Sequence, residues 1–132
     1  MHAKDAQEVS ATMAYLSAGV VALWGVAHVL PTARVVKGFN DTTRDNRLVV
    51  TQEWIAEALA MWFVAAVVVL VTAVGGSHEA LTNWVYRASA VMLVALGALT
   101  AVTGARTPVV FFKLCPVLLG ATAALLLAAS FA

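Results

Sequence analysis

The chain has 132 residues, of which 62 % are hydrophobic and 11 % charged, and its formal net charge is +1. Soluble domains average roughly 45–50 % apolar and 25 % charged residues, so a water-soluble core of this size could not hide the apolar surface of this chain. The composition predicts one membrane-embedded domain, residues 1–132, and the small net charge excludes a general attraction to nucleic acid. With Cys115 as the single cysteine, an internal disulfide is also excluded.

Four apolar stretches follow one another, each long enough to cross a bilayer as a helix of about 20 residues. The first ends at Pro31, because proline cannot continue a helix without cost. Residues 32–41 are expected to form a connecting loop. The predicted spans are residues 9–30, 46–74, 81–103 and 108–131. The mostly short connections favour an all-α integral membrane protein, an antiparallel bundle of four transmembrane helices.

Short sequence motifs refine the predicted boundaries, bends and contacts of these helices. Thr42 followed by Asp45 resembles a capping box, so the second helix is expected to begin near Thr42, outside the hydrocarbon. Pro116 is expected to kink the fourth helix. Small residues, which permit close contact between helices in lipid, recur along the spans. They are Gly19, Gly25, Ala88, Ala90, Gly97, Gly120 and Ala124.

Basic residues are concentrated at one side of the predicted bundle. They are Arg34, Lys37, Arg44 and Arg47 in the first loop, Arg106 in the third loop and Lys113 just after it. The positive-inside rule therefore predicts that these loops are cytoplasmic and that both termini lie outside. The amino-terminal segment lacks the pattern of a signal peptide, so the first span is expected to be retained. The expected location is the inner membrane of a bacterium.

Two carboxylates stand at the start of the second span. Glu53 and Glu57 are four residues apart, so they lie on one face of a helix, and Asn46 shares that face. An ionisable group within a span is costly and usually faces the interior of the bundle at a functional site. His28, near the end of the first span, is expected at the same depth. We therefore predict Glu57, Glu53 and His28 as catalytic residues.

Alternatives to this interpretation remain open. Glu57 could be a structural ion-pair partner of Arg47, Arg106 or Lys113. Alternatively it is a working acid, because burial and a like-charged neighbour both favour the protonated carboxyl group.

His28 could bond a backbone carbonyl, shuttle protons or bind a metal. The Glu53/Glu57 pair lacks the Glu-x-x-His pattern of di-iron bundles, and His2 and His78 are expected on the opposite side, so no metal site is predicted.

The remaining predicted site residues would bind the substrate. They are Trp24, Asn46, Trp54, Met61 and Thr100. Trp62 and Trp84 are assigned to packing or lipid contact, Cys115 to packing, and Arg87 to the opposite end of the bundle. No phosphate-binding loop, dinucleotide fingerprint, nucleophile elbow or zinc-protease motif occurs, so no cofactor is expected.

Two resemblances bear on function. Four spans in about 130 residues, with glycines in the first span, resemble the DoxX-like group of small bacterial membrane proteins, which implies a redox or quinone-linked role. The segment RDNRLVVTQEWIAEAL is similar to the charged approach to a Glu-bearing span in the emopamil-binding, sterol-isomerase-like family. That resemblance implies proton transfer on a sterol by His and Glu residues inside a bundle.

The sequence therefore predicts an integral membrane enzyme that performs acid–base chemistry on a lipophilic small molecule in an apolar cavity. Isomerisation, cyclisation and epoxide opening are the reactions that fit. Its partners would be the lipid bilayer and the substrate, and homo-oligomerisation is left open. The alternatives are a proton-coupled transporter of lipophilic compounds and a quinone-associated or redox-associated membrane subunit.

Overall fold

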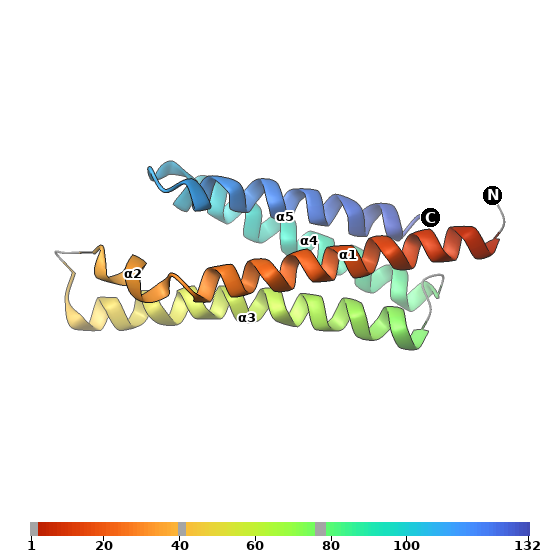
Figure 1. Cartoon of the computed structure of the whole chain (residues 1–132), viewed down its shortest axis with the longest axis horizontal. Helices are drawn as coiled ribbons and strands as arrows, with labels where there is room; N and C mark the ends of the chain where they lie inside the picture. Colours follow the sequence, from red (N-terminus) through yellow and green to blue (C-terminus); the bar gives the residue numbers. More distant parts are fainter. Residues whose placement is uncertain (1–2, 40–41, 76–78) are drawn as a thin grey trace.

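The computed structural model describes residues 3–39, 42–75 and 79–132, which form helices and no strands. The elements are α1 (Ala3–Val29), α2 (Thr32–Lys37), α3 (Arg44–Gly75), α4 (Ala80–Val102), the 3-10 helix η1 (Gly104–Arg106) and α5 (Val110–Ala129). Helices α1, α3, α4 and α5 are long and apolar enough to cross a membrane (Figure 1). The predicted all-α, four-helix membrane bundle is therefore confirmed.

The four long helices form a closed ring. Helix α1 packs against α3 and α5, and α4 packs against the same two helices. Both chain termini lie at one end of the bundle, and α2, η1 and the start of α3 lie at the other (Figure 1). We call these the terminal end and the α2 end. This arrangement follows from the short connections, which make consecutive helices antiparallel neighbours.

Helix α2 corrects the predicted loop at residues 32–41. Thr32–Lys37 is helical, and the amides of Arg34 and Val35 donate to the carbonyl of Pro31 at 2.9 and 3.0 Å. Proline ends α1 because it has no N–H to continue the ladder, and the same property suits it to the start of the next helix. The interruption between α1 and α2 is therefore only a turn.

Helix α3 begins one residue later than the proposed capping box implies. Thr43, not Thr42, caps it, because the Thr43 hydroxyl accepts a hydrogen bond from the amide of Asn46 at 3.2 Å. With 32 residues, α3 is about 48 Å long and exceeds a hydrocarbon layer of about 30 Å. Its first turns extend past α1, and α2 packs on them.

Glycines allow close approach at two of the expected places. A Cβ on Gly25 would lie 2.5 Å from Nε1 of Trp62 in α3, and one on Gly97 would lie 3.5 Å from the Cα of Pro116 in α5. The same prediction is wrong for Gly19 and Gly120, where a Cβ would meet nothing within 4 Å. These two face outward, so spacing along the helix did not reveal which glycines lie at contacts.

Polar side chains tie three helices together at the terminal end. The Ser10 hydroxyl of α1 donates to the Ala129 carbonyl of α5 at 2.7 Å. Arg87 of α4 donates to the hydroxyl and the carbonyl of Ser130, each at 3.2 Å, and lies against the rings of Trp84 and Phe131. These bonds satisfy carbonyls that the last turn of α5 leaves without helical partners.

Candidate functional site

An imidazole–carboxylate pair joins α1 to α3. His28 lies in the last turn of α1, and its Nε2 is 3.2 Å from Oε2 of Glu57. The exposed fraction is 7 % for the histidine side chain and 25 % for the glutamate. It is the one ion pair found between two residues that the structure describes. It lies where polar groups are costly to expose to lipid.

Trp54 holds His28 from a second direction. It precedes Glu57 by about one helical turn, so both side chains reach the same face of α1. The indole stacks on the imidazole with 4.7 Å between ring centroids and 25° between planes, and its Nε1 donates to the His28 carbonyl at 2.6 Å. The ring and the backbone of His28 are thus both fixed by α3.

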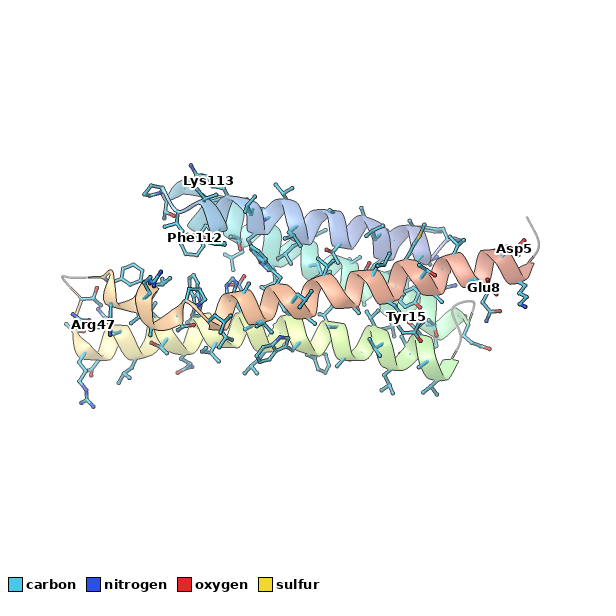
Figure 2. All side chains as sticks on the ribbon, viewed as in Figure 1. Asp5, Glu8, Tyr15, Arg47, Phe112 and Lys113 are labelled. Atoms are coloured by element: carbon cyan, nitrogen blue, oxygen red, sulfur yellow. The ribbon has the colours of Figure 1, made fainter. Side chains whose placement is uncertain are left out.

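Phe112 brings α5 into the site. Its ring meets Trp54 edge-on at 5.2 Å between centroids. Figure 2 shows Phe112 pointing from α5 toward α1, whereas Lys113, the next residue, points away from the bundle. An edge-to-face aromatic pair of this kind adds about 0.5–1.5 kcal/mol beyond the area it buries. Helix α5 therefore supports the wall that holds His28.

A cavity of about 800 Å³ lies beside this aromatic wall, between α1, α2 and the start of α5. Its ionisable lining residues are His28, Arg34 and Lys37, and none of the lining residues is acidic. The others are aromatic or aliphatic: Trp24, Ala27, Leu30, Pro31, Ala33, Val35, Trp54, Val109, Phe111 and Phe112. The volume and the mostly apolar lining are typical of a site for one small lipophilic molecule.

A second cavity of about 430 Å³ lies between α3 and α4. It is lined by Val49, Val50, Glu53, Trp54, Ala56, Glu57, Ala60, Leu96 and Leu99. Trp54 lines both cavities, while His28 lines only the larger one and Glu57 only the smaller one. The His28–Glu57 hydrogen bond therefore joins groups that face two different cavities.

Cys115 lies at the centre of a short polar chain behind the larger cavity. Trp24 Nε1 donates to its sulfur at 3.3 Å, and the sulfur lies 3.9 Å from the Thr100 hydroxyl. The cysteine is fully buried. Cys115 thus fills space as predicted and, in addition, positions the indole of Trp24 against the cavity.

Three of the predicted site residues line neither cavity. Asn46 is exposed at the start of α3, Met61 is fully buried in the core, and Thr100 lies behind Cys115. Trp24 and Trp54 do line the larger cavity. Glu53 lines the smaller cavity, is exposed, and has no ion pair or hydrogen bond within residues 3–39, 42–75 and 79–132. The structure therefore brings together His28, Glu57, Trp54 and Trp24.

The ion-pair partner of Glu57 is His28. None of the three partners considered from the sequence, Arg47, Arg106 and Lys113, pairs with it. Arg47 and Lys113 point away from the bundle (Figure 2). Arg87 lies at the terminal end with Ser130, as expected for a residue outside the site.

Arg34, Lys37, Phe111 and Phe112 line the larger cavity but were not among the predicted site residues. Arg34 and Lys37 were used only to predict the orientation of the protein in the membrane. Phe111 and Phe112 could have been predicted from the sequence, because they begin the fourth span at the same end of the bundle as His28.

The residues that the structure describes contain no group of three or more His, Cys, Asp or Glu side chains able to hold a metal ion. His2 and His78, expected on the opposite side from His28, lie outside the described residues. Comparisons with protein-family models, curated proteins and solved structures find no match. The resemblances to DoxX-like proteins and to sterol-isomerase-like proteins stay predictions.

Proposed function

We propose that this protein is an integral membrane enzyme that performs acid–base chemistry on a lipophilic small molecule bound in the larger cavity. One observation carries the proposal: a carboxylate holds the imidazole of His28 at 3.2 Å, and that imidazole lines an apolar cavity of about 800 Å³. Perturbed or paired titratable groups beside an apolar pocket are typical of catalytic sites.

In this proposal His28 is the group that faces the substrate. The sequence favoured Glu57 for that role, but Glu57 lines only the smaller cavity. His28 takes a proton from the substrate and returns one to another atom, which is the pattern of an isomerisation or cyclisation. Glu57 orients the ring and stabilises the imidazolium, as the third member of a catalytic triad does. The carbonyl end of α1 favours the same positive charge.

The aromatic residues have separate roles in this mechanism. Trp54 covers one face of the imidazole and keeps the ring from turning. Trp24 and Phe112 complete an apolar wall that excludes water from the substrate. Their ring faces would also stabilise a positive charge that develops on a hydrocarbon substrate.

Paired single substitutions test this proposal. Wild-type protein and each variant are incubated in lipid vesicles with a bacterial lipid extract, and products are followed by mass spectrometry. We expect His28→Asn and Glu57→Gln to lower product formation by about 10²–10⁴-fold, the usual contribution of a positioned acid or base. Glu53→Gln removes a carboxylate from the same helix but not from the pair, and should keep most of the activity.

Circular dichroism and gel filtration establish that each variant is folded. A folded His28→Asn protein that forms product at the wild-type rate would show that the imidazole is not the catalytic group.

A second function is favoured by one specific observation. The His28–Glu57 bond joins groups facing two cavities, and Trp54 is a wall of both. A proton could pass between the two sides with a lipophilic molecule, as in a proton-coupled transporter. A flux assay in liposomes with an imposed pH gradient separates the two functions, because transport moves a compound without changing its mass.

For location, we propose a bacterial inner membrane with the α2 end in the cytoplasm and both termini outside. The basic residues of the α2 end, among them Arg34, Lys37, Arg44 and Arg47, support this orientation through the positive-inside rule.

A further inference from the structure

We propose that the larger cavity binds an anionic amphiphile, with its negative head group between Arg34 and Lys37 and its apolar body directed toward His28. The inference names the substrate class of the proposed enzyme and in that respect rests on the proposed function. Binding itself does not depend on catalysis, and it is measured separately below.

Charge is the first support for this proposal. Arg34 and Lys37 both line the cavity, and no acidic residue does. Within the described residues neither side chain has an ion pair or a hydrogen bond. Two cations at the mouth of an apolar site, with no carboxylate among its described lining residues, are complementary to a carboxylate or phosphate. Arginine and lysine are the side chains that recognise these groups most strongly.

The second support is the position of α2. Arg34 and Lys37 are three residues apart, so they lie on neighbouring turns of one face of this six-residue helix. The helix sits beyond the end of α1 and packs on the overhanging start of α3. Both cations are therefore held at the polar end of the cavity, whereas other basic residues of this end, such as Arg47 and Lys113, point away from the bundle (Figure 2).

The third support is the separation of polar and apolar lining. Helix α2 supplies both cations of the lining, together with Ala33 and Val35, whereas α1, α3 and α5 supply the aromatic wall of Trp24, Trp54 and Phe112. His28 is the ionisable lining residue that does not come from α2. An amphiphile with one anionic head matches this division between elements, because its charge and its hydrocarbon each meet a suitable surface.

The test uses the tryptophans of the cavity as reporters. The protein carries Trp84→Phe, because Trp84 is 65 % exposed and would report on bulk lipid. It is placed in phosphatidylcholine nanodiscs at alkaline pH and titrated with dibrominated stearate, whose bromines quench tryptophan fluorescence on contact. The methyl ester of the same acid is the neutral probe. Oleate and phosphatidylglycerol are then added as competitors.

We expect the acid to quench saturably, with an apparent Kd about tenfold lower than that of the ester. The double variant Arg34→Gln/Lys37→Gln should raise the Kd of the acid about tenfold and leave that of the ester unchanged. Arg47→Gln/Lys113→Gln removes the same charge from the same end, outside the cavity, and should change the Kd less than about twofold. Displacement by oleate alone identifies a single-chain acid as the ligand, and displacement by phosphatidylglycerol as well identifies a membrane lipid.

Equal affinity of the acid and the ester for the wild-type cavity would overturn the inference, and this comparison needs no variant to fold. Equal losses in the two double variants would also overturn it, because a general surface charge would then explain the binding. The proposed function fails separately. If the wild-type protein binds the acid saturably but forms no product from it, the enzyme proposal is wrong and the binding site stands.

Discussion

Trp54 links the backbone, the ring and the surroundings of His28. Its Nε1 donates to the His28 carbonyl, its ring stacks on the imidazole, and Phe112 supports its outer edge. The carbonyl lies in the last turn of α1, where the helix supplies no amide partner. The Thr32 hydroxyl lies 3.3 Å from the same oxygen but is closer, at 2.7 Å, to the Val29 carbonyl. The indole is therefore the main partner of the His28 carbonyl.

Trp54→Phe should lower the free energy of unfolding by about 1–2 kcal/mol, because a partly buried carbonyl loses its donor while the aromatic ring remains. Unfolding in mixed micelles, followed by circular dichroism, measures the change. Trp84→Phe is the matched control, since Trp84 is exposed and its ring contact with Arg87 survives in phenylalanine. We expect the control to stay within about 0.5 kcal/mol of wild type. Equal effects of the two substitutions would show that the hydrogen bond to His28 adds nothing.

The sequence predicted part of this residue-scale geometry. His28 and Glu57 could be placed at one level because each lies a countable number of residues from the same loop. Their partnership at 3.2 Å could not be derived, because the rotation of α1 about its axis depends on packing. The mean apolar character of α1 gives no single buried stripe, since lipid-facing and core-facing residues are both apolar.

At the scale of elements, the close contact between α1 and α3 depends on the absence of a side chain at Gly25. Trp62 of α3 lies over Gly25 and donates to the Ala22 carbonyl at 3.0 Å. A methyl group on Gly25 would overlap the indole, so the ring or the helix would have to move. The same indole cannot keep its hydrogen bond if it is displaced.

Gly25→Ala should destabilise the protein by about 1–3 kcal/mol through overpacking. The control is Gly19→Ala in the same helix, where a Cβ meets nothing within 4 Å. That substitution should be neutral or stabilising by up to about 1 kcal/mol, because alanine favours the helix over glycine. Unfolding monitored by tryptophan fluorescence compares the two. Similar stability of both variants would mean that the close approach at Gly25 is not needed.

The short helix α2 shows where element prediction failed. Six residues are too few for a hydrophobic period to be recognised, and Pro31 on one side with Gly38 on the other is equally typical of a loop. The consequence was larger than one missing element. With α2 assigned as loop, Arg34 and Lys37 had no fixed place, and the polar end of the cavity was not predicted.

At the scale of the whole molecule, an even number of spans puts both termini on one side (Figure 1). Cysteine labelling checks this together with the proposed orientation. In a Cys115→Ala background, Lys4→Cys should react with a membrane-impermeant maleimide on intact cells, whereas Arg47→Cys should react only after the cells are opened. The reverse pattern would invert the orientation, and equal reaction at both positions in intact cells would contradict four spans.

The global fold was the most predictable level. Composition alone required lipid as solvent, and four runs of about 20 apolar residues with short connections leave few arrangements other than an antiparallel bundle. Boundaries were less predictable where a helix leaves the membrane without a capping signal, as α1 does by beginning at Ala3, whereas the capping signal predicted the start of α3 to within one residue. Polar helical turns outside the hydrocarbon carry no hydropathy signal.

The two ends of the bundle differ in how they are fastened. At the terminal end, Ser10 and Arg87 bind α5 from two neighbouring helices. At the opposite end, two hollows flank His28, Glu57 and Trp54. Beside α2, α1 and α3 stay joined through His28, while α5 meets this pair through the rings of Phe112 and Trp54. Separation of α5 from the other helices should then be easiest beside α2, so a lipophilic molecule would enter the larger cavity there, sideways from the bilayer.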